Sequence, residues 1–158
     1  MKAQSEQLHD FGDNLGRTPA HRHPRGGGWV ADTAEVQETA YVGPNASVFG
    51  MAKVHAAARI EDFARISGSA WVSLNAVVRD NAQVFGQALV TGNAVVSEGA
   101  WVFEEATVLC NARVSGAANI QGRSTVTEDA KVCGQATLRG LGVIVDGETL
   151  VADQTVLG

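Results

Sequence analysis

Large side chains are scarce in this sequence, and the features that mark several common protein classes are missing. Aromatic residues make up 6% of the chain, although hydrophobic residues reach 45%, most of them alanine and valine. No apolar run approaches the ~20 residues that a membrane span requires. The net charge is −5 and there is no basic block, so the electrostatic signature of a nucleic-acid-binding protein is absent. We therefore expect a thin, regularly layered core, no membrane segment and no nucleic-acid partner.

Cysteine usage and the first residues do not determine the compartment. The two cysteines, Cys110 and Cys133, have no metal-ligand spacing and lie off the repeat period described below, so we expect them not to bond to each other. The opening residues, MKAQSEQLHD, contain no apolar segment, so we expect no signal peptide in the sequence as given. The compartment stays open: cytoplasmic as the sequence stands, or secreted if it is part of a longer protein.

A six-residue period runs through the chain from Val30 onward. Stepping by six from Val30 to Val156 meets an aliphatic residue every time, and stepping from Ala34 to Ala136 meets alanine everywhere except at Ser124. This period fits neither an α-helix nor a simple hairpin array, but it fits a very short strand followed by a bend. In each x-Val-x triplet the valine points inward and its neighbours outward, while the alanine points inward near the bend. Stacked units would bury a continuous column of these side chains, as in solenoid proteins.

The turn residues indicate that three units close one coil. Glycine recurs on an eighteen-residue grid from Gly50 to Gly140, with Glu104 at the missing step, and asparagine occupies a second grid that continues to Asp129 and Gly147. Gly, Asn and Asp tolerate positive φ, so we expect each corner to keep its own turn chemistry. The prediction is an all-β fold: a single-stranded parallel β-helix shaped as a triangular prism, with three hexapeptides per coil and about seven coils.

Two segments of the repeat match a known consensus closely: Val42-Gly43-Pro44-Asn45-Ala46 and Val90-Thr91-Gly92-Asn93-Ala94. They resemble the hexapeptide-repeat superfamily, whose fold is a left-handed β-helix. The left hand is implied by this resemblance and not by the spacing. The segment Gly27-Gly28-Trp29-Val30 resembles the YdcK-like solenoids. The stretch from His23 to Ala34 also resembles solenoid modules of large secreted bacterial proteins.

Both ends of the chain break the six-residue pattern. Residues 1–26 contain no repeat and several turn formers, so we expect an irregular leader or N-terminal cap ahead of the hexapeptide-repeat β-helix of residues 27–140. In residues 141–158 one inward small position falls on Glu148. A buried carboxylate is costly without partners, so we expect a degenerate last coil or a C-terminal cap there.

The resemblance implies two kinds of enzyme, and the sequence matches neither. Acyltransferases of the superfamily use a catalytic histidine and a long loop that leaves the coil. Here the repeat runs from Val30 to Leu138 without an insertion, and His55 is the one histidine inside it. Carbonic anhydrases of the superfamily bind zinc through three histidines, which His55 alone cannot provide, although His21 and His23 in the leader could share a metal. We expect no catalytic residue, no metal and no cofactor.

Three carboxylates fall eighteen residues apart, at one corner of successive coils: Asp62, Asp80 and Glu98. Stacked at ~4.8 Å intervals, they are candidate ligands for Ca²⁺ or another hard cation. The alternative, which we favour, is that each carboxylate accepts hydrogen bonds from N–H groups of the turns.

Aromatic side chains gather on the outside of the predicted prism. The set of candidate interface or ligand-platform residues is Phe49, Phe85 and Phe103 in one outward column, Trp101 beside them, and Trp71 on the next face. A contiguous apolar patch needs an explanation, and three compete. They are a subunit interface, a platform on which carbohydrate stacks, and cover by the leader through Phe11.

The function expected from these patterns is a non-catalytic β-solenoid scaffold or binding module that self-associates into a homo-oligomer. One alternative is a relative of the hexapeptide-family acyltransferases. The other is a carbohydrate-binding accessory module of a secreted protein, whose partner would be a polysaccharide. The sequence names no substrate.

Overall fold

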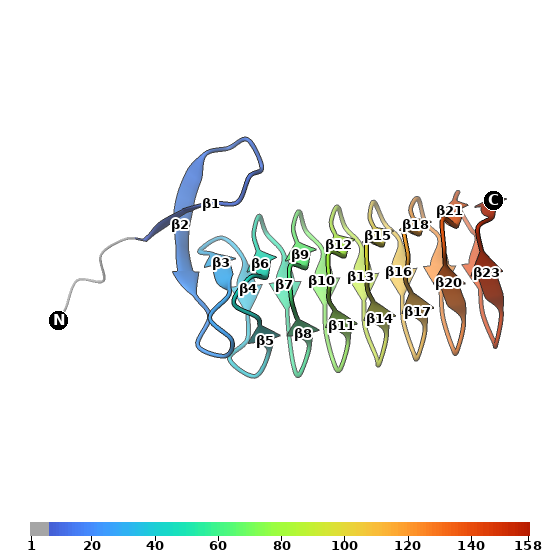
Figure 1. Ribbon diagram of the computed structural model, residues 1–158, viewed down its shortest axis with the longest axis horizontal. Coiled ribbons are helices and arrows are strands. Elements are labelled where there is room, and N and C mark those ends of the chain that lie inside the picture. The colour runs from blue at the N-terminus through green and yellow to red at the C-terminus, as the bar shows by residue number, and fades with distance from the viewer. Residues whose placement is uncertain (1–6) are drawn as a thin grey trace.

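The computed structural model describes residues 7–158, and within them the chain forms strands and turns but no helix (Figure 1). The strands wind into stacked coils, and each coil adds one short strand to each of three sheets. Two of these sheets contain seven parallel strands. This confirms the predicted all-β parallel β-helix of about seven coils with three strands per coil. In the same residues no helix is long and apolar enough to cross a membrane.

Each sheet collects every third strand of the solenoid. The first face contains β1 (Leu8–Asp10), β2 (Arg17–Arg22), β3 (Trp29–Ala31), β6 (Ser47–Val48), β9 (Arg65–Ile66), β12 (Gln83–Val84), β15 (Trp101–Val102), β18 (Asn119–Ile120), β21 (Thr137–Arg139) and β24 (Thr155–Leu157). The second face contains β4 (Glu35–Val36), β7 (Lys53–Val54), β10 (Trp71–Val72), β13 (Leu89–Val90), β16 (Thr107–Val108), β19 (Thr125–Val126) and β22 (Ile144–Val145). The third face contains β5 (Tyr41–Val42), β8 (Arg59–Ile60), β11 (Val77–Val78), β14 (Val95–Val96), β17 (Arg113–Val114), β20 (Lys131–Cys133) and β23 (Leu150–Ala152).

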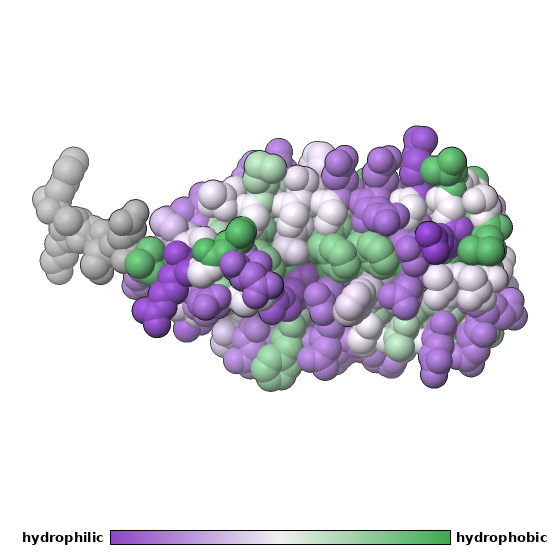
Figure 2. All heavy atoms as spheres, turned by 90° about the horizontal axis from the view of Figure 1, so that it is seen from above, coloured by the Kyte–Doolittle hydropathy of each residue, from purple (hydrophilic) through white to green (hydrophobic). Residues whose placement is uncertain are grey.

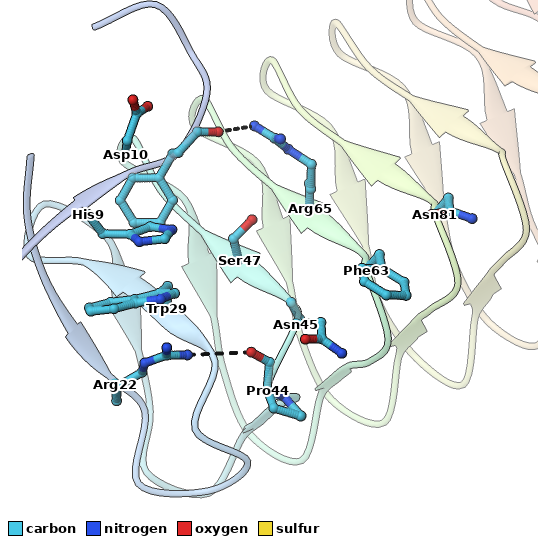
Figure 3. A pocket seen from close by; sticks show the side chains of 12 residues that line it. His9, Asp10, Arg22, Trp29, Pro44, Asn45, Ser47, Phe63, Arg65 and Asn81 are labelled. Atoms are coloured by element: carbon cyan, nitrogen blue, oxygen red, sulfur yellow. Dashed lines mark hydrogen bonds between the residues drawn. The ribbon is translucent and has the colours of Figure 1, made fainter. Parts of the chain in front are cut away.

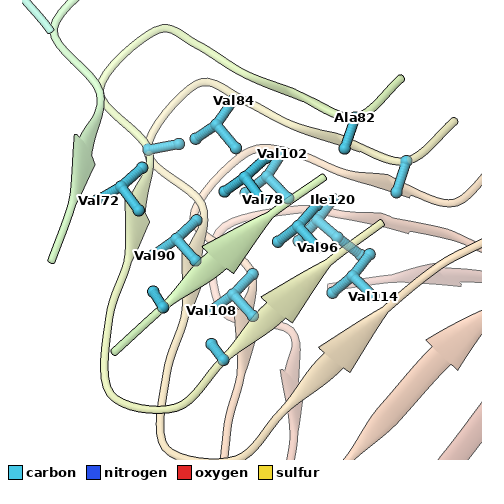
Figure 4. Close-up of a cluster of buried hydrophobic side chains, with 14 of the residues drawn as sticks. Val72, Val78, Ala82, Val84, Val90, Val96, Val102, Val108, Val114 and Ile120 are labelled. Atoms are coloured by element: carbon cyan, nitrogen blue, oxygen red, sulfur yellow. The ribbon is translucent and has the colours of Figure 1, made fainter. Parts of the chain in front are cut away.

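The interior is the predicted column of valine and alanine. Val72 pairs with Val90 across two coils, eighteen residues apart, and both side chains are fully buried (Figure 4). A fully buried valine stabilises the fold by roughly 1.5–3 kcal/mol relative to an exposed one. Ser124 is the one polar residue in the alanine column, and its hydroxyl donates to the carbonyl of Gln121 at 2.8 Å. The polar substitution therefore keeps its hydrogen bond inside an apolar core.

The corners match the prediction for glycine but not for asparagine. On the glycine grid Gly86 has φ of +70°, and Glu104, the missing step, also takes a positive φ of 59°. At the second corner the residue before each asparagine has the positive φ, as Leu74 does at 60° and Cys110 at 61°. The prediction that the asparagine grid itself adopts positive φ is therefore wrong.

The asparagine column has a different role, because its side chains bond to one another along the prism. The amide nitrogen Nδ2 of Asn75 donates to Oδ1 of Asn93 at 3.2 Å, and Asn93 donates in turn to Asn111 at 3.0 Å. Asn111 ends the ladder by donating to Oδ1 of Asp129 at 3.1 Å. An amide carries both a donor and an acceptor, so a stack of identical amides satisfies itself coil after coil.

One additional residue near the C-terminus shifts the repeat. Thr125 pairs with Ile144, a spacing of nineteen residues, whereas earlier coils keep eighteen. As a result Val145 is buried at 5% exposure while Ile144 is 65% exposed. The inward position predicted by stepping in sixes is therefore wrong at Ile144 and, by the same shift, at Leu150. The shift also leaves Glu148 exposed rather than facing the core.

At the other end a β-hairpin extends the first face beyond the first coil. Strands β1 and β2 pair antiparallel, and β2 continues antiparallel onto β3, with Ala20 opposite Ala31 and Arg22 opposite Trp29 (Figure 1). These strands lie in the segment expected to be an irregular leader or N-terminal cap, of which residues 1–6 lie outside the described part of the chain. The hairpin is apolar on the side that it turns to the solenoid, where Phe11 and Ala20 are buried.

Candidate functional site

Three aromatic residues form a contiguous cluster on the first face: Phe85, Trp101 and Phe103, here called the aromatic cluster. The rings of Phe85 and Phe103 stack with centroids 4.9 Å apart. Phe85 and Trp101 form an edge-to-face pair whose ring centroids are 6.0 Å apart. They meet because alternate residues of a strand point outward and consecutive coils are in register. Trp101 is 43% exposed. Figure 2 shows hydrophobic side chains midway along the solenoid on this side of the molecule.

Phe49 lies in the same outward column but does not join the cluster. Its ring stacks on Phe11 of the hairpin with centroids 4.9 Å apart, and both side chains are buried. Ser67 occupies the intervening step of the column, between Phe49 and Phe85. Cover by the leader therefore accounts for Phe49, whereas the hairpin does not extend over the aromatic cluster.

Trp71 stands alone on the second face, away from the aromatic cluster. It is 46% exposed, its ring lies edge-on to His55 at 5.6 Å, and Lys53 Nζ lies 5.9 Å from the ring centroid. The His55 ring nitrogen Nε2 lies 2.8 Å from Glu35 Oε1, an ion-pair contact that is poorly aligned as a hydrogen bond. His55 is thus held between a carboxylate and an indole ring.

The two leader histidines do not converge on a metal site. His21 Nδ1 lies 2.8 Å from Asp32 Oδ1 at the surface. His23 is buried, with Nδ1 lying 3.1 Å from the carbonyl of Arg25 and Nε2 lying 3.2 Å from that of Gln37. Within residues 7–158 no group of three His, Cys, Asp or Glu side chains is arranged to hold a metal ion.

The three stacked carboxylates bind backbone N–H groups of neighbouring coils. Asp62 Oδ2 accepts from the N–H of Asp80 at 3.3 Å, and Asp80 Oδ2 accepts from the N–H of Glu98 at 3.0 Å. Glu98 Oε2 continues the series to the N–H of Gly116 at 2.6 Å. All three acids take positive φ at their corner. Each carboxylate therefore accepts a hydrogen bond from the turn of the next coil. This is the arrangement that we favoured over cation binding from the sequence.

A groove of about 560 Å³ lies where the hairpin meets the first coils, and we call it the hairpin groove (Figure 3). Its hairpin side carries Arg22, Trp29 and His9, and its solenoid side carries Phe63 and Arg65. The remaining lining residues are Asp10, Phe11, Pro44, Asn45, Ala46, Ser47 and Asn81. The repeat pattern does not predict this site, because the site depends on strands in the leader.

Stacked side chains fix the hairpin side of the groove. The Trp29 ring lies between His9, whose ring is stacked on it at 4.3 Å, and the guanidinium of Arg22, 4.1 Å from the ring centroid. Burial, and then the nearby charge of Arg22, lower the pKa of His9 below its usual value of 6.5, while Asp10 acts in the opposite direction. The imidazole is thus favoured in its neutral form, which suits a ring packed on an indole beside a cation.

Comparison with protein-family models, with curated proteins and with solved structures finds no match for this chain.

Proposed function

We propose that the chain is a non-catalytic β-solenoid scaffold that associates with further copies of itself through the aromatic cluster. The observation that carries the proposal is the contiguous set of outward aromatic rings on a straight sheet face, with Trp101 at 43% exposure. Aromatic anchors of this kind dominate the binding energy of protein interfaces. A sheet face that is in register over many coils also offers a rigid surface, so little conformational freedom is lost on association.

The surroundings of the aromatic cluster suit a second copy of the same chain. The residues that directly flank the cluster on the first face are uncharged and polar: Gln83, Asn119 and Gln121, while charged residues such as Arg65 and Glu105 lie further out. A symmetric contact centred on the cluster would therefore bring no like charges together at its middle, although the chain carries a net charge of −5. An apolar centre with a polar rim is the usual anatomy of a protein interface.

We also infer that the solenoid belongs to the hexapeptide-repeat left-handed β-helix superfamily and is similar to YdcK-like members. The support is the unbroken valine and alanine period together with corners at positive φ, such as Gly86. In such a solenoid the coils themselves are structural, and activity depends on what is added to them. Here no loop leaves the coil between residues 30 and 138.

A carbohydrate-binding module is the second candidate, and the same cluster favours it. Phe85 and Phe103 cover one face of each other, but the Trp101 ring beside them is 43% exposed and offers a surface on which a sugar ring could stack. The two candidates differ in one measurable respect, because sugar stacking requires free aromatic faces while self-association covers them.

The experiment is sedimentation equilibrium of the purified protein and of two single variants, Trp101→Ala and Trp71→Ala. The two tryptophans have similar exposure but lie on different faces, so Trp71→Ala is the matched control. We expect an oligomer for the protein and for Trp71→Ala, and at least tenfold weaker association for Trp101→Ala. A monomer at high concentration would contradict the scaffold proposal. Polysaccharide binding that Trp101→Ala abolishes would favour the second candidate instead.

The acyltransferase alternative has its own test. Acetyl transfer from acetyl-CoA that disappears in His55→Ala would overturn the non-catalytic assignment. We expect no transfer in either protein, because His55 is engaged with Glu35 and Trp71 and does not line the hairpin groove.

A further inference from the structure

We propose that the hairpin groove binds an acidic saccharide. This site is distinct from the aromatic cluster and shares no residue with it. Its volume of about 560 Å³ lies within the range of small-molecule sites and suits a segment of about two or three sugar units. Three features carry the proposal: unpaired guanidinium groups, their fixed orientation, and an exposed ring between two free amides.

The groove holds two cations without an acidic partner. Among residues 7–158 neither Arg22 nor Arg65 forms an ion pair with a carboxylate. Over the same described residues the only carboxylate that lines the groove is that of Asp10, whose Oδ1 already accepts from the N–H of Gly12 at 2.8 Å. Two positive charges against one negative charge favour an anionic ligand there, although the chain as a whole is acidic.

Acidic residues also occur near the solenoid side of the groove, but their carboxylates are engaged. Asp62 and Asp80 precede the lining residues Phe63 and Asn81 in the chain. Their side-chain oxygens accept backbone N–H groups of the next coil, and neither residue lines the groove. They therefore reduce the local positive potential without occupying the place of a ligand.

Both guanidinium groups are held in place before any ligand arrives. Arg22 stacks on Trp29, and its Nη1 donates to the carbonyl of Gly27 at 2.9 Å. Arg65 lies over the ring of Phe49, and its Nη2 donates to the carbonyl of Phe11 at 2.6 Å. A guanidinium has five N–H donors, so each arginine keeps donors for a carboxylate. Because the side chains are already ordered, binding costs little further entropy.

The solenoid side of the groove supplies contacts for a sugar ring. Phe63 is 60% exposed and stands between Asn45 and Asn81 in one corner column, eighteen residues apart from each (Figure 3). In the described part of the chain the side-chain amides of these two asparagines make no hydrogen bond. An exposed ring flanked by free amides offers stacking for the apolar face of a sugar and partners for its hydroxyl groups.

These features together select a ligand class. A simple anion such as phosphate would use the guanidinium groups but not the ring or the amides. A neutral saccharide would use the ring and the amides but leave both cations without a partner. A saccharide that carries carboxylates, such as an oligogalacturonate, uses all three.

The test is calorimetric titration of the whole protein with trigalacturonate, with neutral maltotriose and with inorganic phosphate. We expect trigalacturonate to bind, with an affinity that falls as salt is added, and maltotriose and phosphate to bind at least tenfold more weakly. The variant Phe63→Ala removes an exposed side chain that the fold does not need, and we expect it to weaken trigalacturonate about tenfold.

Matched variants separate this proposal from the preceding one. Trp71→Ala removes an exposed ring on another face and should leave trigalacturonate binding unchanged, as should Trp101→Ala. The proposal is overturned if trigalacturonate fails to bind, if maltotriose or phosphate binds as tightly, or if Phe63→Ala has no effect. Arg65→Lys keeps the charge but loses the planar fork, so we expect weaker trigalacturonate binding, and because Arg65 also contacts Phe11 and Phe49 its unfolding midpoint is measured alongside.

Discussion

Phe85 and Phe103 stack face to face across two consecutive coils, with ring centroids 4.9 Å apart and ring planes 5° from parallel. The separation matches the ~4.8 Å between neighbouring strands, because residues eighteen apart occupy equivalent places in the prism. The contact is therefore imposed by the coil geometry and needs no special backbone feature.

The corner alanines should resist enlargement. Ala94 is fully buried, so Ala94→Leu must push the coil apart, and we expect it to lower the free energy of unfolding by about 1–3 kcal/mol. Ala117 is an exposed alanine of a neighbouring corner, so Ala117→Leu is the matched control and should change stability by less than about 0.5 kcal/mol. Urea unfolding measures both. Equal effects of the two substitutions would show that the corner is not closely packed.

The corner glycines should differ in their tolerance of a side chain. Gly86 has φ of +70°, and a Cβ atom there would lie 2.7 Å from the backbone nitrogen of Glu104. We expect Gly86→Ala to destabilise the fold by more than about 1 kcal/mol. Gly99 does not have positive φ, and the nearest atom to an added Cβ is the carbonyl oxygen of Gly116 at 3.5 Å, so Gly99→Ala should be tolerated. Thermal unfolding of the two variants distinguishes them.

The shifted register near the C-terminus gives a matched pair of substitutions. Val145 is buried and Ile144 is exposed, so Val145→Asp places a charge against the core while Ile144→Asp places it in water. The N–H of Thr127 donates to the carbonyl of Val145 at 2.9 Å, and its amide hydrogen exchange reports on the last coil. We expect much faster exchange in Val145→Asp and little change in Ile144→Asp. The opposite order would mean that the six-residue step continues unshifted.

The packing of the hairpin should depend on pH through His9. Its pKa is lowered by burial and by Arg22, so the folded protein binds this proton less well than the unfolded chain does. The contribution of His9 is therefore present above pH 6.5 and is lost as the pH falls below that value. We expect an NMR titration midpoint below that of the same histidine in urea. Arg22→Gln should move the midpoint upward, and a midpoint unchanged by urea would contradict this reading.

Much of the coil could be predicted from the sequence because its physical signal is local and repeated. An aliphatic residue every six positions can be buried throughout only if short strands stack in coils, and Val72 and Val90 are fully buried in this way. The turn chemistry was harder to predict, because Leu74 and Cys110 take positive φ although neither residue favours it. Stacking against the next coil overrides the local preference there.

The ends and the hairpin groove could not be predicted, since each depends on a single event rather than on a period. One additional residue after Gly140 reverses which side chains face inward. The six-residue step does not reveal the shift, because it still meets an aliphatic residue at Ile144 and Leu150. The groove requires Arg22 and Arg65, which are 43 residues apart in the chain, to line the same cavity. The aromatic cluster was predictable, because Phe85 and Phe103 share one outward column and Trp101 lies beside them on the same face.

The near identity of the coils has a consequence for how the chain finds its alignment. Every coil presents nearly the same inward valine and alanine residues, so the core contacts of a strand would be almost as good against any other coil as against its own neighbour. The interior thus carries almost no information about which coil is which. That information lies in the parts that occur once. They include the antiparallel pairing of β2 with β3, in which Ala20 lies opposite Ala31, and the stacking of the Phe11 ring on Phe49. The hairpin therefore marks the first coil, while the continuity of the chain fixes the order of the others, because a slip by one coil would force a whole eighteen-residue turn out of the stack.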